Sequence, residues 1–387
     1  MSKKWVHVLL ASMAALSLLA VGCGKTATDS NEIKIGANVE LTGNVANYGQ
    51  QALSGFQLAI KEANDAGGIN GKKITLVVAD NKSEASEATN AMTKLITQDK
   101  AVTIFGPVTS SNFIAASQVA QDNKIPAVTP SATNAKVTVD DSGKVKPYNF
   151  RACFTDSFQG TVMATFAANS LKTKTAAIFI DNSSDYSKSL AEVFEKVFTQ
   201  NGGKIIAKEA YLQKDTDFRA ALTKLKAVNP ETIFIPGYYE EVGKIAKQAR
   251  ELGISAPLLG TDGWTDSKLV EIAGVEALNN SYYSNHFSAE NKDATAVKFI
   301  EAYKKEYGKD PNVFAALGYD SGLMVIDAIK RAGSADPQKI KEALEQTKNF
   351  QASTGVLSLD ASHNPIKTAF ILQRQNGVES FKEKIDP

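Results

Sequence analysis

The chain has 387 residues, of which 43% are hydrophobic and 22% are charged, with a formal net charge of +1. A single hydrophobic core rarely extends over so many residues, so this length predicts two globular domains. The near-neutral charge, without any basic run, excludes a charge-driven nucleic-acid-binding protein, and we expect no nucleic-acid partner.

The N-terminal segment is typical of an export signal. Lys3 and Lys4 form a positive start, residues 5–21 are mostly apolar, and small residues follow before Cys23. This layout indicates a cleaved signal peptide and not a spanning helix. No later stretch is apolar over the length that a bilayer crossing needs. We therefore expect residues 1–22 to be removed during export.

Cys23 directly follows Gly22 in a segment that resembles a bacterial lipobox, although Leu19 stands one place away from its usual position. This resemblance implies that Cys23 carries lipid and that residues 23–32 form a flexible lipidated tether. Lipid on one cysteine would anchor the protein to the outer face of the cytoplasmic membrane without spanning it. Ordinary secretion with an incidental cysteine is the alternative interpretation.

Strand and helix patterns alternate along the rest of the chain. Strands are predicted at 33–39, 73–81, 101–106, 125–131, 174–182 and 204–212. Helices are predicted at 49–68, 85–96, 113–122 and 190–198, the segment 294–350 is mostly helical, and 354–377 returns to strands. This alternation predicts an α/β protein with doubly wound parallel sheets that helices cover on both faces.

Two segments share one layout. In each of 102–134 and 231–264, an apolar strand is followed by a loop with Pro and Gly, a helix, and a short strand that ends in polar residues. The span from Ile104 to Ile125 is 21 residues, and so is the span from Ile233 to Ile254. Two similar α/β domains are the simplest explanation of this weak repeat.

The loop after the first of these strands offers hydroxyl groups at the start of a helix. Thr109, Ser110 and Ser111 stand there, and Ser131 and Thr133 follow the next strand. Free N–H groups and the helix dipole favour an anion at such a place. No phosphate-loop motif and no nearby Lys or Arg are present, so a single carboxylate fits better than a polyphosphate. Ordinary helix capping by Ser or Thr is an equally good alternative.

The matching loops of the second segment carry different chemistry. Tyr238 follows Gly237, and Asp262 lies eight residues past Ile254, as Thr133 lies eight past Ile125. An acid near aromatic rings suits a cation, although Asp262 could also form an Asx turn. One domain thus offers anion chemistry and the other cation chemistry, and a zwitterion satisfies both.

No pattern indicates catalysis, a metal or a cofactor. His286 and His363 are isolated and lack metal-ligand spacing, and no nucleophile-elbow or dinucleotide motif is present. Cys153 is the single cysteine after Cys23, so no internal disulfide is expected, and a small buried apolar role is favoured for it. An extracellular enzyme therefore has no positive support.

Several segments resemble one known family. They include "IKIGANVELTGNVANYGQQALSGFQLAIKEANDAGG", "FGPVTSS", "TPSAT" and "IPGYYEEVGKIAKQARELG", and the resemblance covers about residues 33–377. The chain is similar to the branched-chain (Leu/Ile/Val-type) amino-acid-binding proteins of ABC transporters, in their lipoprotein form. This resemblance implies the periplasmic-binding-protein type I fold, with two domains joined by a three-crossing hinge. The implied domains are 33–153 plus 287–360 and 154–286 plus 361–387.

The resemblance also implies ligand contacts. Ser110 resembles the residue that binds the α-carboxylate of the ligand, and Ser131 and Thr133 resemble the pair that holds carboxylate and ammonium. Tyr238 and Asp262 resemble the ammonium partners of the second domain, where the family often has Glu in place of Asp262. The other implied contacts are Ala132, in the same loop, and Tyr48, Tyr186 and Phe314, which would line or close the side-chain pocket.

The implied function is solute binding without catalysis, cofactor or metal. We expect a monomer that binds Leu, Ile and Val in the interdomain cleft and delivers them to the permease of an ABC importer. One methylene group changes affinity by only about 10–200-fold, so these ligands should overlap. The alternative is a ligand sensor of the same fold for another amino acid or an amide.

Overall fold

The computed structural model describes residues 32–287 and 293–387, and Glu32–Pro387 form one compact unit. The predicted signal peptide and Cys23 lie outside the described residues, so export and lipidation stay predictions. No helix in the described ranges combines the length and the apolar character that crossing a membrane requires.

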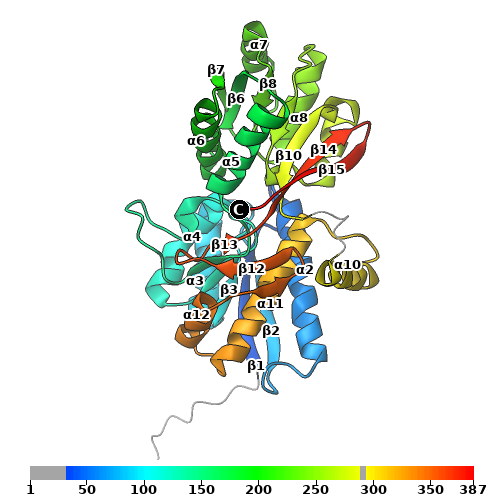
Figure 1. Cartoon of the computed structure of the whole chain (residues 1–387). Helices are drawn as coiled ribbons and strands as arrows, with labels where there is room; N and C mark the ends of the chain where they lie inside the picture. Colours follow the sequence, from blue (N-terminus) through cyan, green and yellow to red (C-terminus); the bar gives the residue numbers. More distant parts are fainter. Residues whose placement is uncertain (1–31, 288–292) are drawn as a thin grey trace, which may run out of the picture. The chain divides into compact units, whose positions relative to one another are not determined.

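Five parallel strands form the first sheet (Figure 1). In spatial order they are β2 (Lys73–Asp80), β1 (Glu32–Val39), β3 (Thr103–Phe105), β4 (Ala127–Thr129) and β5 (Asn149–Arg151). Gly36 at the centre of β1 lies opposite Val77 of β2 and Ile104 of β3. The order of winding reverses between β1 and β3, and in open α/β sheets ligands bind beyond the carboxyl ends of the strands at such a switch point.

The second sheet repeats this order. In spatial order its strands are β15 (Val378–Ile385), β14 (Ala369–Gln375), β10 (Ser281–Asn285), β9 (Leu258–Gly260), β8 (Thr232–Phe234), β6 (Thr175–Asp181) and β7 (Lys204–Tyr211). The strands from β7 to β10 are parallel, whereas β14 and β15 are antiparallel additions. Its switch point lies between β6 and β8. Both sheets therefore present the same kind of ligand-binding edge.

Helices surround both sheets. The first sheet has α2 (Ala46–Asp65), α3 (Ala85–Thr97), α4 (Ser110–Asn123), α10 (Ala294–Tyr307), α11 (Val313–Ala332) and α12 (Pro337–Glu345). The second has α5 (Asp156–Thr165), α6 (Asp185–Gln200), α7 (Arg219–Val228), α8 (Tyr239–Glu251) and α9 (Ser267–Ala273). Single helical turns complete the set: η1 (Ala135–Val137), η2 (Phe166–Ser170), η3 (Asp262–Trp264) and η4 (Glu276–Leu278).

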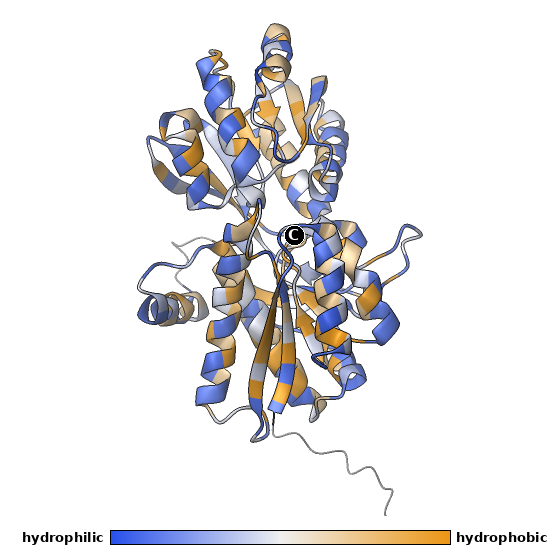
Figure 2. Cartoon of the chain, turned by 180° about the vertical axis from the view of Figure 1, so that it is seen from behind, coloured by the Kyte–Doolittle hydropathy of each residue, from blue (hydrophilic) through white to orange (hydrophobic). Residues whose placement is uncertain are grey.

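The predicted repeat is confirmed. Its two copies fold as β3-α4-β4 and β8-α8-β9, with the same parallel pairing of the flanking strands. The helix predicted at 190–198 is confirmed within α6, and its residues Leu190, Phe194 and Phe198 are buried. In Figure 2, the strands are mostly hydrophobic, whereas hydrophobic and hydrophilic residues alternate along the helices. This pattern is typical of amphipathic helices that cover a buried sheet.

The chain passes between the two sheets three times. The passages follow β5, follow β10, and separate β14 from a small antiparallel sheet of β11 (Phe350–Ala352), β12 (Gly355–Leu359) and β13 (Pro365–Ile366). The first sheet, this small sheet and their helices are called the first lobe below, and the second sheet with α5 to α9 is called the second lobe. The residue boundaries predicted for the two domains stay a prediction.

Periodicity alone missed four strands, β5, β10, β11 and β15, and the first two were missed for the same reason. β5 has three residues and β10 has the sequence SYYSN, and every residue in both is buried. Burial on both faces removes the alternation of apolar and polar residues that identifies a strand, so only sheet pairing reveals such segments.

The backbones of α2 and α11 approach each other closely at two glycines. A Cβ atom on Gly318 would lie 2.0 Å from the Ala52 carbonyl oxygen, and one on Gly55 would lie 1.9 Å from the Ala315 carbonyl oxygen. Both obstacles are backbone atoms, which cannot rotate aside. This contact holds α11 against the helix that carries Tyr48.

The Gly318→Ala variant should therefore lower the free energy of unfolding by about 1–3 kcal/mol or more, because the two helices must separate. Urea unfolding followed by circular dichroism measures this change. Lys330→Ala, on the exposed side of the same helix, is the control and should change stability little. Equal stability of Gly318→Ala and the wild type would show that the close helix contact is wrong.

Candidate functional site

A small cavity lies between the lobes, where the carboxyl ends of the strands of both sheets meet. Its empty volume, part of which is open to solvent, is about 250 Å³. Residues of both lobes form its walls.

Seven of the nine residues predicted to contact a ligand line this cavity. They are Tyr48, Ser110, Ser131, Tyr186, Tyr238, Asp262 and Phe314, and Val108, Thr109 and Gly263 complete the lining. Ala132 and Thr133 are buried and are not among the lining residues. The structure thus brings together side chains that are up to 266 residues apart (314 minus 48).

Glu40 organises the first wall, and the sequence analysis missed it. Its carboxylate is fully buried and accepts hydrogen bonds from the backbone N–H groups of Val108 (3.1 Å) and Thr109 (3.2 Å). It also accepts from the Thr109 hydroxyl (2.9 Å) and from Asn112 Nδ2 (2.9 Å). Glu40 follows β1 at the switch point, so the same strand-end rule that selected Ser110 could have found it.

Donors remain free on this wall. Among the described residues, the backbone N–H groups of Ser110 and Ser111 have no hydrogen-bond acceptor, as expected in the first turn of α4. The Ser110 hydroxyl oxygen accepts from the Asn134 N–H (3.2 Å), and its own proton is available to the cavity. Ser131 Oγ donates to the Val108 carbonyl at 2.9 Å. The helix start therefore offers several donors to one anionic group.

Arg151 shapes the neighbouring loop from behind. Its fully buried guanidinium donates to the Ala132 carbonyl (2.9 Å) and to the Asn134 carbonyl (2.7 Å). Ala132 and Thr133 therefore lie between the cavity wall and this arginine. Thr133 Oγ1 is buried without a partner of hydrogen-bond geometry among the described residues.

The second wall centres on Asp262, at the start of η3 after β9. Tyr186 donates from its hydroxyl to Asp262 Oδ1 at 2.5 Å, and His286 Nε2 lies 3.0 Å from Asp262 Oδ2. Asp262 is 4% exposed. Both side-chain partners are neutral groups, so the wall retains a net negative charge.

Aromatic rings complete the cavity. Tyr186 and Tyr238 stack with ring centroids 5.2 Å apart, and Tyr48 stacks on Phe314 at 4.2 Å. Tyr48 also joins the lobes, because its hydroxyl donates to the Gly263 carbonyl and accepts from the Tyr239 N–H at 3.0 Å. These rings give the site an apolar side beside its two polar walls.

Further hydrogen bonds connect the lobes around the cavity. They join Asn44 Nδ2 to Glu241 Oε1 (3.0 Å), Asn47 Nδ2 to Asp266 Oδ1 (2.9 Å), Ser111 Oγ to Asp185 Oδ2 (3.0 Å) and Asn134 Nδ2 to the Asp185 carbonyl (2.8 Å). Such bonds between two separately built lobes are made when the cleft is shut. The structure therefore shows the closed arrangement of the site.

A second hollow, with an empty volume of about 660 Å³, adjoins the cavity and shares Thr109 and Tyr238 with it. Polar residues of both lobes line this hollow, among them Glu84. Lys214 of the second lobe forms an exposed ion pair with Glu84 at 2.7 Å.

Two buried titratable groups lie beside Asp262. Burial and nearby Asp262 together raise the pKa of Asp156 to about 7, against the opposing effects of the neighbouring Thr133 hydroxyl, of the Gln159 hydrogen bond (3.2 Å) and of Arg151. Burial lowers the pKa of His286 to about 4, although Asp262 favours its protonation. At neutral pH, His286 is therefore uncharged.

The described ranges contain no cluster of three or more His, Cys, Asp or Glu side chains that could hold a metal ion. Cys153 is fully buried, and its burial raises the pKa of its thiol to about 12, so it is a poor nucleophile.

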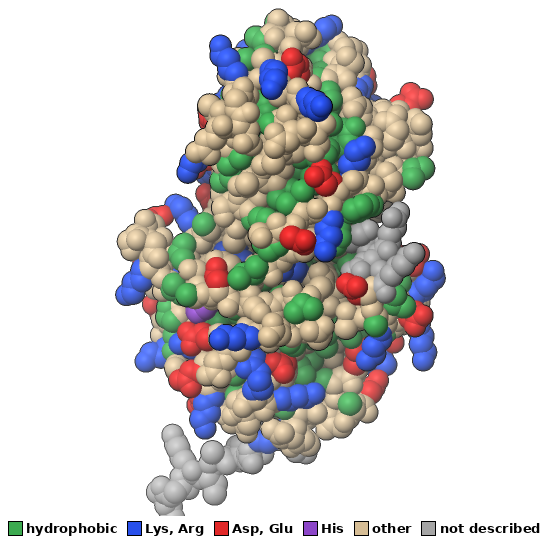
Figure 3. Space-filling model, viewed as in Figure 1, with side chains coloured by type: hydrophobic (Ala, Val, Ile, Leu, Met, Phe, Trp, Pro, Cys, Tyr) green, Lys and Arg blue, Asp and Glu red, His purple; other side chains and the backbone are tan. Residues whose placement is uncertain are grey.

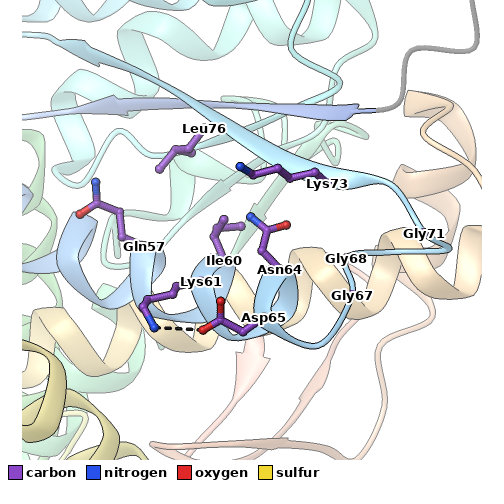
Figure 4. Close-up of a pocket in the computed structure, with 10 residues that line it drawn as sticks. All are labelled: Gln57, Ile60, Lys61, Asn64, Asp65, Gly67, Gly68, Gly71, Lys73 and Leu76. Carbon is purple, nitrogen blue, oxygen red and sulfur yellow. Dashed lines mark hydrogen bonds and ion pairs between the residues drawn. The ribbon is translucent and has the colours of Figure 1, made fainter.

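A larger hollow, with an empty volume of about 1140 Å³, lies elsewhere on the first lobe, at the end of α2 and the start of β2 (Figure 4). Its charged side chains include Lys61 and Asp65, which pair with each other at 3.0 Å. It is found at the amino-terminal edge of the sheet, where α/β proteins rarely bind ligands.

On the face shown in Figure 3, acidic and basic side chains intermingle over the surface.

The two shifted pKa values have opposite effects on stability. Between about pH 3.8 and pH 7, Asp156 is protonated in the folded chain and ionised in the unfolded chain. The free energy of unfolding therefore falls as pH rises through this range. Between about pH 6.5 and 4, the unfolded chain protonates His286 and the folded chain does not, so stability falls as pH drops. In the wild type, these effects oppose each other.

The Asp156→Asn variant should remove the first effect and expose the second. Its melting temperature should fall more steeply than that of the wild type between about pH 6.5 and pH 5. Melting curves from about pH 5 to pH 8 measure this difference, with Asp141→Asn on an exposed turn as the control. Parallel curves for Asp156→Asn and the wild type would contradict the assigned titration.

Comparison with known proteins agrees with this architecture. Residues 32–379 match the sequence profile of the periplasmic binding protein family. A Pseudomonas aeruginosa relative, the leucine-, isoleucine-, valine-, threonine- and alanine-binding protein, is 29% identical over 358 residues, which are 92% of this chain and 93% of that protein.

Solved structures are similar over the same range. The leucine-binding protein LivK of Thermotoga maritima is 36% identical with a TM-score of 0.86, and the alignment covers 92% of this chain and 99% of LivK. The branched-chain amino-acid transporter substrate-binding protein LivJ of Streptococcus pneumoniae, in complex with isoleucine, is 40% identical with a TM-score of 0.85, covering 92% and 100%. The predicted fold is confirmed, and the chain belongs to the periplasmic binding protein family.

Proposed function

We propose that this protein is the solute receptor of an ABC importer and that it binds leucine, isoleucine and valine in the cavity between the lobes. One observation carries the proposal. Free donors at the start of α4 and the buried carboxylate of Asp262 line opposite walls of the same small cavity. A free α-amino acid has the complementary charges at one end of a small molecule.

The first wall would hold the α-carboxylate. The N–H groups of Ser110 and Ser111 and the Ser110 hydroxyl are its donors, and the helix dipole adds to their attraction. Glu40 already occupies the N–H groups of Val108 and Thr109, so the ligand would use the next donors along the helix start.

The second wall would hold the ammonium group. A carboxylate has about four acceptor sites, and Tyr186 and His286 use one on each oxygen of Asp262. The remaining sites would accept the ammonium, beside the rings of Tyr186 and Tyr238. Pairing of both ligand charges is essential, because an unpaired charge in so enclosed a site is costly.

The ligand side chain would pack against Tyr48, Phe314 and Val108, which form the apolar side of the cavity. Burying a side chain of the size of Val or Leu stabilises a complex by roughly 1.5–3 kcal/mol. The relatives in P. aeruginosa and S. pneumoniae, whose names include branched-chain amino acids, support this choice of ligand.

The remaining parts of the proposal concern delivery. The receptor would act as a monomer outside the cytoplasmic membrane, held there by lipid on Cys23, and would pass its ligand to the permease subunits of the importer. A ligand that contacts both lobes would shift the protein toward the closed arrangement, the form that a permease would distinguish from an empty receptor.

The ligand is tested with a thermal-shift panel of the 20 amino acids on the mature protein. Leucine, isoleucine or valine at about 100 times its dissociation constant should add about 2.7 kcal/mol of stability and raise the melting temperature by several degrees. Asp262→Asn should weaken leucine binding at least about 30-fold, because the ammonium would lose its charged partner.

Asp327→Asn is the matched control, since Asp327 pairs with Arg331 on the partly exposed side of α11, and it should leave binding unchanged. A panel in which another solute stabilises the protein, while the three branched-chain amino acids leave the melting curve unmoved, would refute the proposed ligand.

Membrane anchoring is tested separately. With the natural N-terminus, the protein expressed in a bacterium that processes lipoproteins should partition into the detergent phase of Triton X-114, and Cys23→Ser should move it to the aqueous phase. Mass spectrometry of the N-terminal peptide should find a lipid on Cys23. An unmodified cysteine in the mature protein would favour ordinary secretion.

A further inference from the structure

His286 contacts the candidate ammonium-binding carboxylate from behind. Its side chain is fully buried directly after β10, and Nε2 lies 3.0 Å from Asp262 Oδ2. The ring of Phe154 stacks on the imidazole with centroids 3.4 Å apart. Phe154 follows β5 and His286 follows β10, so both rings belong to segments where the chain passes between the lobes.

The surroundings of His286 select one tautomer. Asp262 Oδ2 can only accept, so the nitrogen that faces it must carry the proton. Nδ1 has no hydrogen-bond partner among the described residues, which fits an unprotonated nitrogen better than a buried N–H donor. The charged groups that act on the ring are Asp262 and, more distantly, Lys367, and burial keeps the imidazole neutral.

Asp262 is thereby held on both oxygens without losing its charge. Tyr186 donates to Oδ1 and His286 donates to Oδ2, and neither partner is a cation. The Asp262 backbone N–H also lies 3.4 Å from Gln159 Oε1, which accepts from Ser284 Oγ at 3.0 Å. A lysine or arginine in place of His286 would neutralise the carboxylate and remove its attraction for a ligand cation.

We propose that His286 is a positioning residue for ligand recognition: as the neutral Nε2–H tautomer, it fixes the Asp262 carboxylate so that its free acceptor sites face the ligand ammonium. The ligand part of this inference rests on the proposed function. Without the imidazole, Oδ2 loses its side-chain donor, and the buried carboxylate rotates away or takes up a proton. Either change weakens the grip on an amine and leaves the carboxylate-binding wall intact.

The binding test uses two ligands that differ only in the amine. Leucine carries it, and 4-methylpentanoate has the same carboxylate and side chain without it. His286→Asn places its amide near the Nδ1 position and cannot reach Asp262, so leucine affinity should fall roughly 5- to 150-fold. The affinity for 4-methylpentanoate should not fall, because this ligand has no amine for Asp262 to bind. Isothermal titration calorimetry or ligand competition measures both constants.

Two further variants separate positioning from a general structural effect. His286→Gln can place its amide N–H near the Nε2 position and should recover most of the lost leucine affinity. His363→Gln is the matched control, because His363 is also a buried histidine stacked on a phenylalanine, Phe150, but contacts Asn149 and Glu345 and not the cavity. Equal losses for both ligands in His286→Asn, or a Gln variant no better than Asn, would overturn the proposal.

A ligand-free measurement tests the same contact if these variants fail to fold. Only His286 and His363 remain once residues 1–22 are removed, since the third histidine is His7. Nitrogen-15 histidine NMR of the mature wild type, assigned with His363→Gln, should show a neutral Nε2–H imidazole for His286 near neutral pH. An Nδ1–H tautomer or a charged ring would overturn the inference. If wild-type protein binds no branched-chain amino acid, the proposed function fails, while this spectrum still decides the His286 contact.

Discussion

The site depends on how two buried carboxylates on opposite walls are satisfied. Glu40 accepts hydrogen bonds from two backbone amides, a hydroxyl and an amide side chain, so its acceptor capacity is used within the first lobe. Asp262 receives two neutral side-chain donors and keeps acceptor capacity. A buried carboxylate with unused capacity is costly unless a cation joins it. This difference between the two carboxylates makes the cavity asymmetric, with hydrogen-bond donors on one wall and an acceptor on the other.

The sequence allowed most of the fold and about half of this chemistry to be predicted. Ser110, Tyr238 and Asp262 could be selected because each follows a strand of a recognisable repeat. Glu40 and His286 were missed, because their roles arise from contacts with segments 69 and 24 residues away. Periodicity also missed β5 and β10, whose short buried sequences show no alternation. For β5 and β10, pairing between strands, and not the local pattern, identifies the strand.

The two lobes meet mainly through polar contacts at the cleft. Each hydrogen bond of this kind contributes only about 0.5–1.5 kcal/mol net, because the groups are well hydrated when the lobes separate. Tyr48 combines such a bond with aromatic packing, since it bridges Gly263 and Tyr239 and stacks on Phe314. Modest cross-lobe energies are what a receptor needs if a small ligand is to decide between open and closed arrangements.

The burial of Cys153 has a practical consequence for following these lobes. Among the described residues it is the single cysteine, and its thiol is sealed from solvent with a pKa of about 12. Maleimide dyes, which need an accessible thiolate, would leave it unlabelled. A cysteine introduced at the rim of the cleft would then be the one thiol in the described part of the chain that such a dye could label. The natural scaffold is thereby suited to a fluorescent solute sensor without first removing any native thiol from its interior.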